Sequence, residues 1–250
     1  MTTSASILPI LGRWVDTALA LIYPPACQLC STRRASAAEG FVCSRCWSQV
    51  RFIKPPFCGR CGLPYAGELT TPFECANCKD MELYFSSARS AVAAGGMILE
   101  VIHRYKYQRA LWFEPFLADI FLRQALPEVD PELWDFIVPV PLHPTKHRER
   151  EFNQAARIAC YLSKATGIPL NNHVIFRVAS TRTQTQLTRE ARAANVRTAF
   201  VSRNNLTLNG ARIILVDDVL TTGSTTNACA RVLRKAGAGA VCVWTVARGL

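Results

Sequence analysis

Four Cys-x-x-Cys pairs near the start of the chain constrain the fold more than any other feature of this sequence. Such a pair wraps two thiolates around one side of a tetrahedral Zn²⁺, and a second pair about a dozen residues away closes the shell. The pairs are Cys27/Cys30, Cys43/Cys46, Cys58/Cys61 and Cys75/Cys78. They predict a double zinc ribbon over residues 23–80 that holds two structural Zn²⁺, with either consecutive or interleaved pairs sharing each metal.

A disulfide framework is the alternative use of these cysteines, but it requires export from the cell. Residues 7–22 are apolar, yet Arg13 and Asp16 interrupt them and no basic segment precedes them, so they do not resemble an export signal. The run is also too short to span a bilayer. We therefore expect an amphipathic helix over residues 1–22, no membrane span and a cytoplasmic protein. Ribbons of this kind bind nucleic acid, dock other proteins or only stabilise a fold.

Residues 83–250 alternate between strand and helix patterns, which is typical of an α/β domain with a mainly parallel sheet flanked by helices. The expected strands cover residues 84–94, 135–140, 174–178, 212–217 and 240–247. The expected helices cover residues 97–108, 112–126, 153–166 and 224–236.

The segment from Ile213 to Thr225 carries the clearest chemistry. A continuous apolar run predicts a buried parallel strand, and Asp217 and Asp218 follow at its carboxyl end, where open α/β sheets bind ligands. The next residues, Thr221, Thr222, Gly223, Ser224 and Thr225, offer hydroxyls and backbone N–H groups to a tetrahedral anion at the start of a helix. An acid pair beside an anion loop suits the vicinal hydroxyls and the phosphate of a ribose 5-phosphate.

This segment resembles the motif with which type I phosphoribosyltransferases bind 5-phosphoribosyl 1-pyrophosphate (PRPP). The whole chain resembles the ComF family, in which a double zinc ribbon precedes a phosphoribosyltransferase-like domain. The resemblance rests also on Tyr105-Lys106-Tyr107, Val138-Pro139-Val140-Pro141-Leu142, Arg150-Glu151-Phe152-Asn153-Gln154, Thr183-Gln184-Thr185-Gln186-Leu187 and Arg192-Ala-Ala-Asn195.

The resemblance implies a role for each motif. Asp217 and Asp218 would hold the ribose hydroxyls, and Thr221–Thr225 would hold the 5-phosphate. The loop of Leu142, His143, Pro144, Thr145 and Lys146 would receive the pyrophosphate with Mg²⁺, and residues 179–198 would close over the substrate. One departure is Glu151, where the family commonly has glycine, so the loop here is expected to differ and to bind anions less well.

The surplus of basic residues, net +11 over the chain, is concentrated near these motifs. Residues 143–212 hold twelve lysines and arginines against three acids. This field suits PRPP and departing pyrophosphate, and it also suits nucleic acid. Five arginines of this stretch are candidates for anion contacts: Arg148, Arg150, Arg182, Arg189 and Arg192.

The resemblance implies a Mg²⁺-dependent phosphoribosyltransferase that transfers ribose 5-phosphate from PRPP to an unidentified acceptor and that is linked, as the ComF family is, to DNA uptake in natural competence. No residue is assigned to covalent catalysis. Two alternatives stay open: a non-catalytic protein that responds to PRPP and binds single-stranded DNA, and a zinc-ribbon module that docks competence proteins. We also expect the double ribbon to take the place of the base-recognising hood of related enzymes.

Overall fold

The structure is a computed structural model that describes residues 25–65, 67, 75–79, 81–179, 198–204 and 206–250. The chain divides into two compact units, Met1–Gln49 and Val50–Leu250. The helix expected over residues 1–22 lies outside the described residues. The first unit contains the short helix α2 (Ser44–Trp47).

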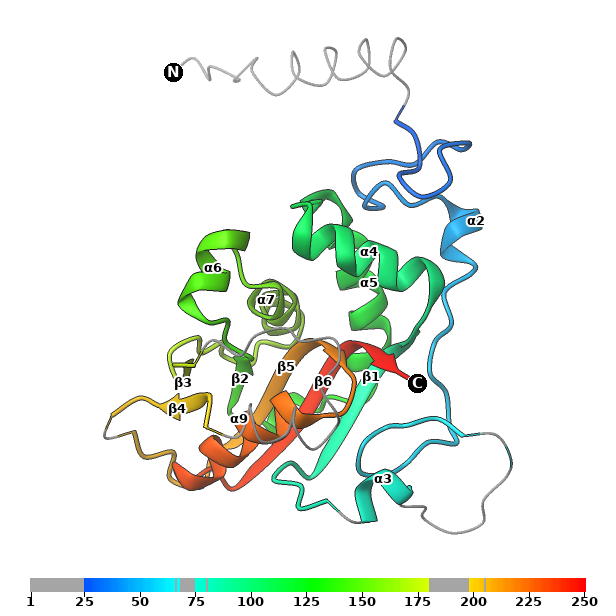
Figure 1. Ribbon diagram of the computed structural model, residues 1–250. Helices are drawn as coiled ribbons and strands as arrows, with labels where there is room; N and C mark the ends of the chain where they lie inside the picture. Colours follow the sequence, from blue (N-terminus) through cyan, green and yellow to red (C-terminus); the bar gives the residue numbers. More distant parts are fainter. Residues whose placement is uncertain (1–24, 66, 68–74, 80, 180–197, 205) are drawn as a thin grey trace, which may run out of the picture. The chain divides into compact units, whose positions relative to one another are not determined.

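A four-stranded parallel sheet forms the centre of the second unit (Figure 1). Its strands, in spatial order, are β1 (Ser87–Ala94), β6 (Ala240–Gly249), β5 (Arg212–Leu220) and β2 (Phe136–Pro139). Nearly every residue of β6 is buried, as expected for a parallel strand with helices on both faces. Because all four strands run the same way, their carboxyl ends meet at one edge, where the candidate site lies.

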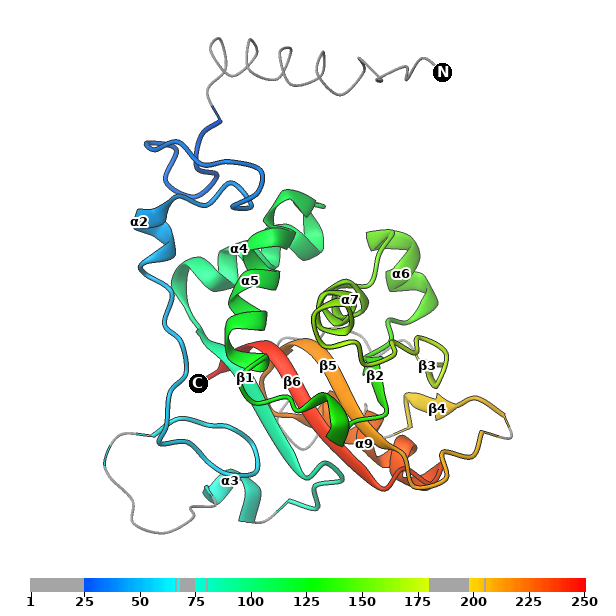
Figure 2. The same ribbon diagram turned by 180° about the vertical axis from the view of Figure 1, so that it is seen from behind.

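Helices cover both faces of the sheet (Figures 1 and 2). Helices α5 (Glu114–Ala125) and α7 (Gln154–Thr166) pack together on one face, and α9 (Ser224–Lys235) packs on the other. Helix α4 (Gly96–Tyr107) follows β1, and α7 begins where the Asn153 side chain accepts hydrogen bonds from the N–H groups of Ala155 and Ala156. The expectation of a mainly parallel sheet flanked by helices is confirmed.

Two elements differ from the sequence-based expectation. Residues 144–150, expected as part of a loop, form helix α6 (Pro144–Arg150), because Pro144 stands at its first position and His143 Nδ1 accepts a hydrogen bond from the Thr145 N–H. The expected strand at 174–178 is β3 (Ile175–Arg177), which pairs antiparallel with β4 (Phe200–Ser202) in a separate two-stranded sheet. Most of the expected closing loop, residues 180–197, lies outside the described residues.

The rest of the second unit consists of short elements and a ribbon segment. The short elements are the helix α3 (Ala76–Lys79) and the 3₁₀ turns η1 (Leu111–Phe113) and η2 (Pro131–Leu133). The chain around residues 51–60 runs along β1, on the side that β6 leaves free. The N–H of Ile53 donates to the carbonyl of Ala91 at 3.0 Å, and that of Ala88 donates to the carbonyl of Arg60 at 2.6 Å. The ribbon segment thus covers the edge of the sheet.

Candidate phosphate-binding site and metal centres

Eight cysteines form two four-thiol clusters, one in each unit. Cys27, Cys30, Cys43 and Cys46 make the first cluster, and Cys58, Cys61, Cys75 and Cys78 make the second. Each combines two consecutive pairs, so the interleaved alternative is excluded. The remaining cysteines, Cys160, Cys229 and Cys242, lie outside both clusters, and none of the eleven forms a disulfide.

The thiol geometry fits Zn²⁺. Pairs of sulfur atoms lie 3.7–3.8 Å apart in the first cluster and 3.5–3.9 Å apart in the second. A tetrahedron with Zn–S bonds of about 2.3 Å has edges of about 3.8 Å. Burial raises the pKa of the Cys58 thiol, but hydrogen bonds from backbone N–H groups, that of Cys61 foremost, outweigh it and bring the pKa to about 7. Both clusters therefore suit structural zinc.

The two carboxylates at the end of β5 lie next to each other and next to a lysine from α4. Lys106 Nζ lies 2.6 Å from Asp218 Oδ2, and the N–H of Asp218 donates to Asp217 Oδ1 at 2.9 Å. Burial raises the pKa of Asp217 to about 7, and the negative charge of the neighbouring Asp218 carboxylate is the second cause. Near neutral pH Asp217 is therefore partly protonated, while Lys106 pairs with the neighbouring Asp218.

The segment after the acid pair forms a tight loop into α9. Gly223 has φ +77°, a left-handed conformation that glycine adopts without strain. Thr222 Oγ1 and Ser224 Oγ lie 2.9 Å apart, and Thr226 Oγ1 donates to the Gly223 carbonyl at 3.0 Å. Hydroxyls thus surround the amino end of α9, where backbone N–H groups attract anions.

A cavity of about 740 Å³ joins this loop to the acid pair and to basic side chains from other elements. Lys106 of α4, Lys146 and Arg150 of α6 and Arg177 of β3 are its cationic lining residues. Burial lowers the pKa of Lys146, and next to burial the guanidinium of Arg177 lowers it as well. Thr221 and Thr225 also line the cavity, so a ligand there would meet hydroxyls, carboxylates and cations together.

The structure brings some of the predicted site residues to this cavity and leaves others away from it. Leu142, Lys146, Arg150, Asp217 and Asp218 line it. The predicted residues that do not line it are His143, Pro144, Thr145, Arg148, Thr222, Gly223 and Ser224. Thr222 and Gly223 line a second cavity of about 350 Å³ instead. Arg182, Arg189 and Arg192 lie outside the described residues.

Two cations of the cavity had no assigned role in the sequence. Lys106 belongs to the Tyr105-Lys106-Tyr107 motif, which supported the family resemblance but did not indicate which residue Lys106 contacts. Arg177 was one of many basic residues. The placement of α4 depends on Glu114, which is 6% exposed: Tyr105 Oη donates to it at 2.8 Å and Arg157 Nη2 at 3.0 Å. These bonds to the buried Glu114 carboxylate hold α4, and with it Lys106, against α5 and α7.

Glu151 occupies the position where the sequence departs from the family. It follows α6 with φ +67°, so the backbone there is left-handed, as a glycine at this position would favour. Its carboxylate pairs with Arg109, whose Nη2 lies 2.9 Å away, and it does not line the cavity. The loop therefore keeps the conformation suited to glycine despite the larger residue.

Comparison with known proteins gives consistent family matches. The double zinc ribbon domain family matches residues 18–81. Competence protein F of Haemophilus influenzae is 35% identical over 84% of this chain and 92% of that protein. DNA utilization protein YhgH of Salmonella typhi is 33% identical over 92% of this chain and all of that protein. Competence protein ComFC of Bacillus subtilis is 28% identical over 83% of this chain and 84% of that protein.

Two solved structures are similar to parts of the chain. A purine phosphoribosyltransferase from Pyrococcus horikoshii matches 56% of this chain and 85% of its own, with 19% identity and a TM-score of 0.32. The allosteric regulatory enzyme of purine biosynthesis matches 52% of this chain and 24% of its own, with 24% identity and a TM-score of 0.33. Separately, none of the helices within the described ranges has both the length and the hydropathy that crossing a membrane requires.

Proposed function

Because this chain belongs to the ComF family, we propose that it is a phosphoribosyltransferase that binds PRPP in the 740 Å³ cavity and releases pyrophosphate. The observation that supports this most is the convergence of the acid pair, Thr221 and Thr225 of the hydroxyl loop, and cations from α4, α6 and β3 on one cavity. A ribose with a phosphate at one end and a pyrophosphate at the other needs these three kinds of group together. The acceptor is not identified.

In this proposal each group has one task. Asp217 and Asp218 accept hydrogen bonds from the ribose hydroxyls, while residues 221–225 hold the 5-phosphate. The acceptor forms a bond to the anomeric carbon as the bond from that carbon to pyrophosphate breaks, and the bonding electrons leave with the pyrophosphate. Lys146, Arg150 and Arg177 stabilise the negative charge that develops on the leaving group. No covalent intermediate with the protein is required, because positioning and charge carry the reaction.

Magnesium is implied by the family resemblance. The cavity's acidic oxygens come chiefly from Asp217 and Asp218, and the latter already pairs with Lys106. Since Mg²⁺ prefers oxygen ligands and commonly binds through substrate phosphates, these residues fit a metal that arrives with PRPP. Its contribution would be to neutralise charge on the pyrophosphate.

Calorimetric titration of the zinc-loaded chain with PRPP and Mg²⁺ tests the proposal. We expect micromolar binding that Asp217→Asn/Asp218→Asn abolishes, because the ribose hydroxyls lose their acceptors. Asp119→Asn is the matched control, since Asp119 pairs with Arg123 on the exposed side of α5. Binding that is unchanged in the double variant would overturn the site assignment. A pyrophosphate-release screen across bases, amines and oligonucleotides would then separate turnover from binding and identify the acceptor.

The second candidate is a protein that binds single-stranded DNA and uses PRPP as a signal. It is favoured by the basic stretch of residues 143–212 and by relatives named for competence and DNA utilization. A docking role for the ribbons toward competence proteins is a further possibility that the family names suggest. PRPP binding without pyrophosphate release from any acceptor would favour these candidates over the enzyme.

A further inference from the structure

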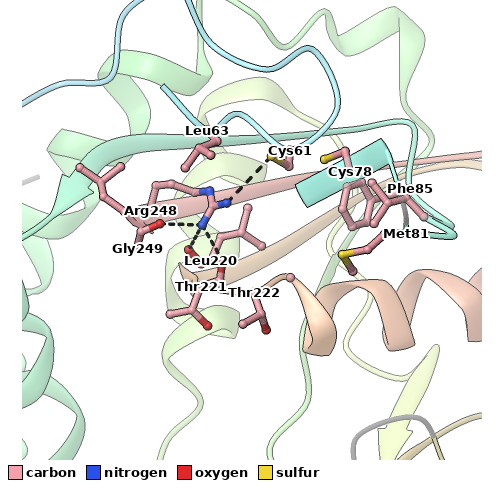
Figure 3. A pocket seen from close by; sticks show the side chains of 13 residues that line it. Cys61, Leu63, Cys78, Met81, Phe85, Leu220, Thr221, Thr222, Arg248 and Gly249 are labelled. Atoms are coloured by element: carbon pink, nitrogen blue, oxygen red, sulfur yellow. Dashed lines mark hydrogen bonds between the residues drawn. The ribbon is translucent and has the colours of Figure 1, made fainter. Parts of the chain in front are cut away.

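Arg248, near the end of β6, holds the backbone that leads into residues 221–225, the hydroxyl loop proposed to bind the 5-phosphate and called the phosphate loop below. Its side chain lies inside the second unit, where the residue is 5% exposed. Nη1 donates to the carbonyls of Leu220 at 3.0 Å, Thr221 at 2.5 Å and Gly249 at 2.7 Å (Figure 3). Leu220 ends β5 and Thr221 begins the loop, so this one guanidinium fixes the carbonyls where strand becomes loop.

The same guanidinium contacts the second metal centre. Nη2 lies 3.9 Å from the Sγ of Cys61, as the dashed line in Figure 3 shows. Between the two contacts lies a cavity of about 350 Å³, which Cys61 and Cys78 line on one side and Thr221, Thr222 and Gly223 on the other. The zinc ribbon and the phosphate loop are thus neighbours, and Arg248 bonds to both.

Charge explains why an arginine stands at this position. A buried guanidinium is costly without a partner of opposite charge. None of the ion pairs between described residues includes Arg248. Four thiolates around one Zn²⁺ carry a net charge of about −2 because ligating cysteines are deprotonated. The loaded second centre therefore supplies the counter-charge, whereas four neutral thiols would not.

We propose that Arg248 couples metal occupancy of the second Cys₄ centre to the conformation of the phosphate loop. With zinc bound, the thiolate charge holds the guanidinium in place, and the guanidinium holds the carbonyls of Leu220 and Thr221. Without zinc, the buried cation loses its counter-charge and the loop loses its anchor. Coupling of this kind is reciprocal, so a phosphate ester in the loop also raises the affinity of the second centre for zinc. Arg248 is a positioning residue in this scheme and does not touch the substrate.

Amide hydrogen exchange of residues 219–226 tests the coupling without any ligand. In the full chain, removal of zinc by a chelator is expected to speed exchange by about fivefold or more, the lower end of ordinary allosteric coupling. In Arg248→Met we expect the amides of residues 219–226 to exchange fast even with zinc bound, and we expect removal of zinc not to raise the exchange rate further. Arg234→Met is the matched control, because Arg234 also bridges backbone carbonyls, those of Ala238 and Gly239, at the opposite end of β6. It should behave like the unmodified chain.

Two outcomes would overturn the proposal: a loop in zinc-loaded Arg248→Met that exchanges as slowly as the unmodified loop, or an equal response to zinc removal in both proteins. A Cys43→Ser/Cys46→Ser chain, which lacks only the first centre, should keep a slowly exchanging loop. If Arg248→Met does not fold, Arg248→Lys replaces it, because lysine keeps the charge but cannot reach the thiol and the carbonyls together.

Ribose 5-phosphate provides a second readout, which rests on the proposed function. It should raise the affinity of the second centre for zinc, measured at equilibrium by competition with a colorimetric chelator, by about fivefold in the unmodified chain and in Arg234→Met. It should have no such effect in Arg248→Met. Absence of ribose 5-phosphate binding would contradict the phosphate site itself, while the exchange experiment would still decide whether Arg248 couples the zinc centre to the loop.

Discussion

Glu151 carries a local conflict between side chain and backbone. Left-handed conformations cost non-glycine residues about 1–2 kcal/mol. The residue has φ +67°, and its partner Arg109 has φ +54°. Their ion pair is largely exposed, with 54% and 63% of the two side chains accessible, so it contributes at most about 1 kcal/mol. The left-handed backbone therefore destabilises the folded protein by more than the ion pair stabilises it.

Glu151→Gly is accordingly expected to raise the free energy of unfolding by about 0.5–1 kcal/mol. Urea denaturation followed by circular dichroism measures this. Glu149→Gly is the control, since Glu149 lies within α6 and glycine there should lower the stability by about 1 kcal/mol. If both substitutions destabilise the protein equally, the left-handed conformation at residue 151 is not a source of strain.

At the scale of elements, the second ribbon is part of the sheet's construction. Its chain covers the edge of β1, and Gly62 makes the close contact possible. Gly62 has φ +66°, and a Cβ placed there would lie 2.6 Å from the Ala88 carbonyl oxygen. The zinc centre and the edge of the sheet therefore depend on one another, and removal of residues 1–80 would expose β1 for pairing with other chains.

Gly62→Ala should cost about 2 kcal/mol or more, because the backbone conformation and the clash with β1 both oppose it. Gly59→Ala, three residues earlier, is the matched control: a Cβ there meets nothing within 4 Å, and its effect should stay within about 0.5 kcal/mol. Thermal unfolding of the zinc-loaded proteins compares them. Equal melting temperatures would show that the ribbon does not pack on β1 as described.

For the whole molecule, the distribution of charge matters more than the net value of +11. Cations from α4, α6 and β3 converge on the cavity, and further arginines of the same stretch lie beyond the described residues. Such a field would attract PRPP and a nucleic acid backbone equally, so charge alone does not choose between the two candidate functions.

If single-stranded DNA binds, its affinity should fall steeply with salt, because bound phosphates release counterions. Reversal of Arg182, Arg189 and Arg192 to glutamate should weaken binding and reduce the slope of log affinity against log salt by about 2, from three lost contacts. Fluorescence anisotropy with an oligothymidylate measures this. Arg33→Glu/Arg34→Glu, in the first unit, is the comparison: loss of binding there instead would place the DNA on the first ribbon.

Features that depend on neighbours along the chain were predictable from the amino-acid sequence. The spacing of the cysteines predicted two metal centres, and the apolar run before Asp217 predicted a buried strand followed by a loop suited to anions. Both features involve residues that are close together in the sequence. Residues 144–150 were predicted as part of a loop, although Pro144 favours the first position of a helix. Three contacts became visible only in the folded chain: Lys106 with Asp218, Tyr105 with Glu114, and Arg248 with both Cys61 and Thr221. Cys61 and Arg248 lie 187 positions apart in the sequence, and a contact between such distant residues forms only once the strands have paired and the side chains have packed.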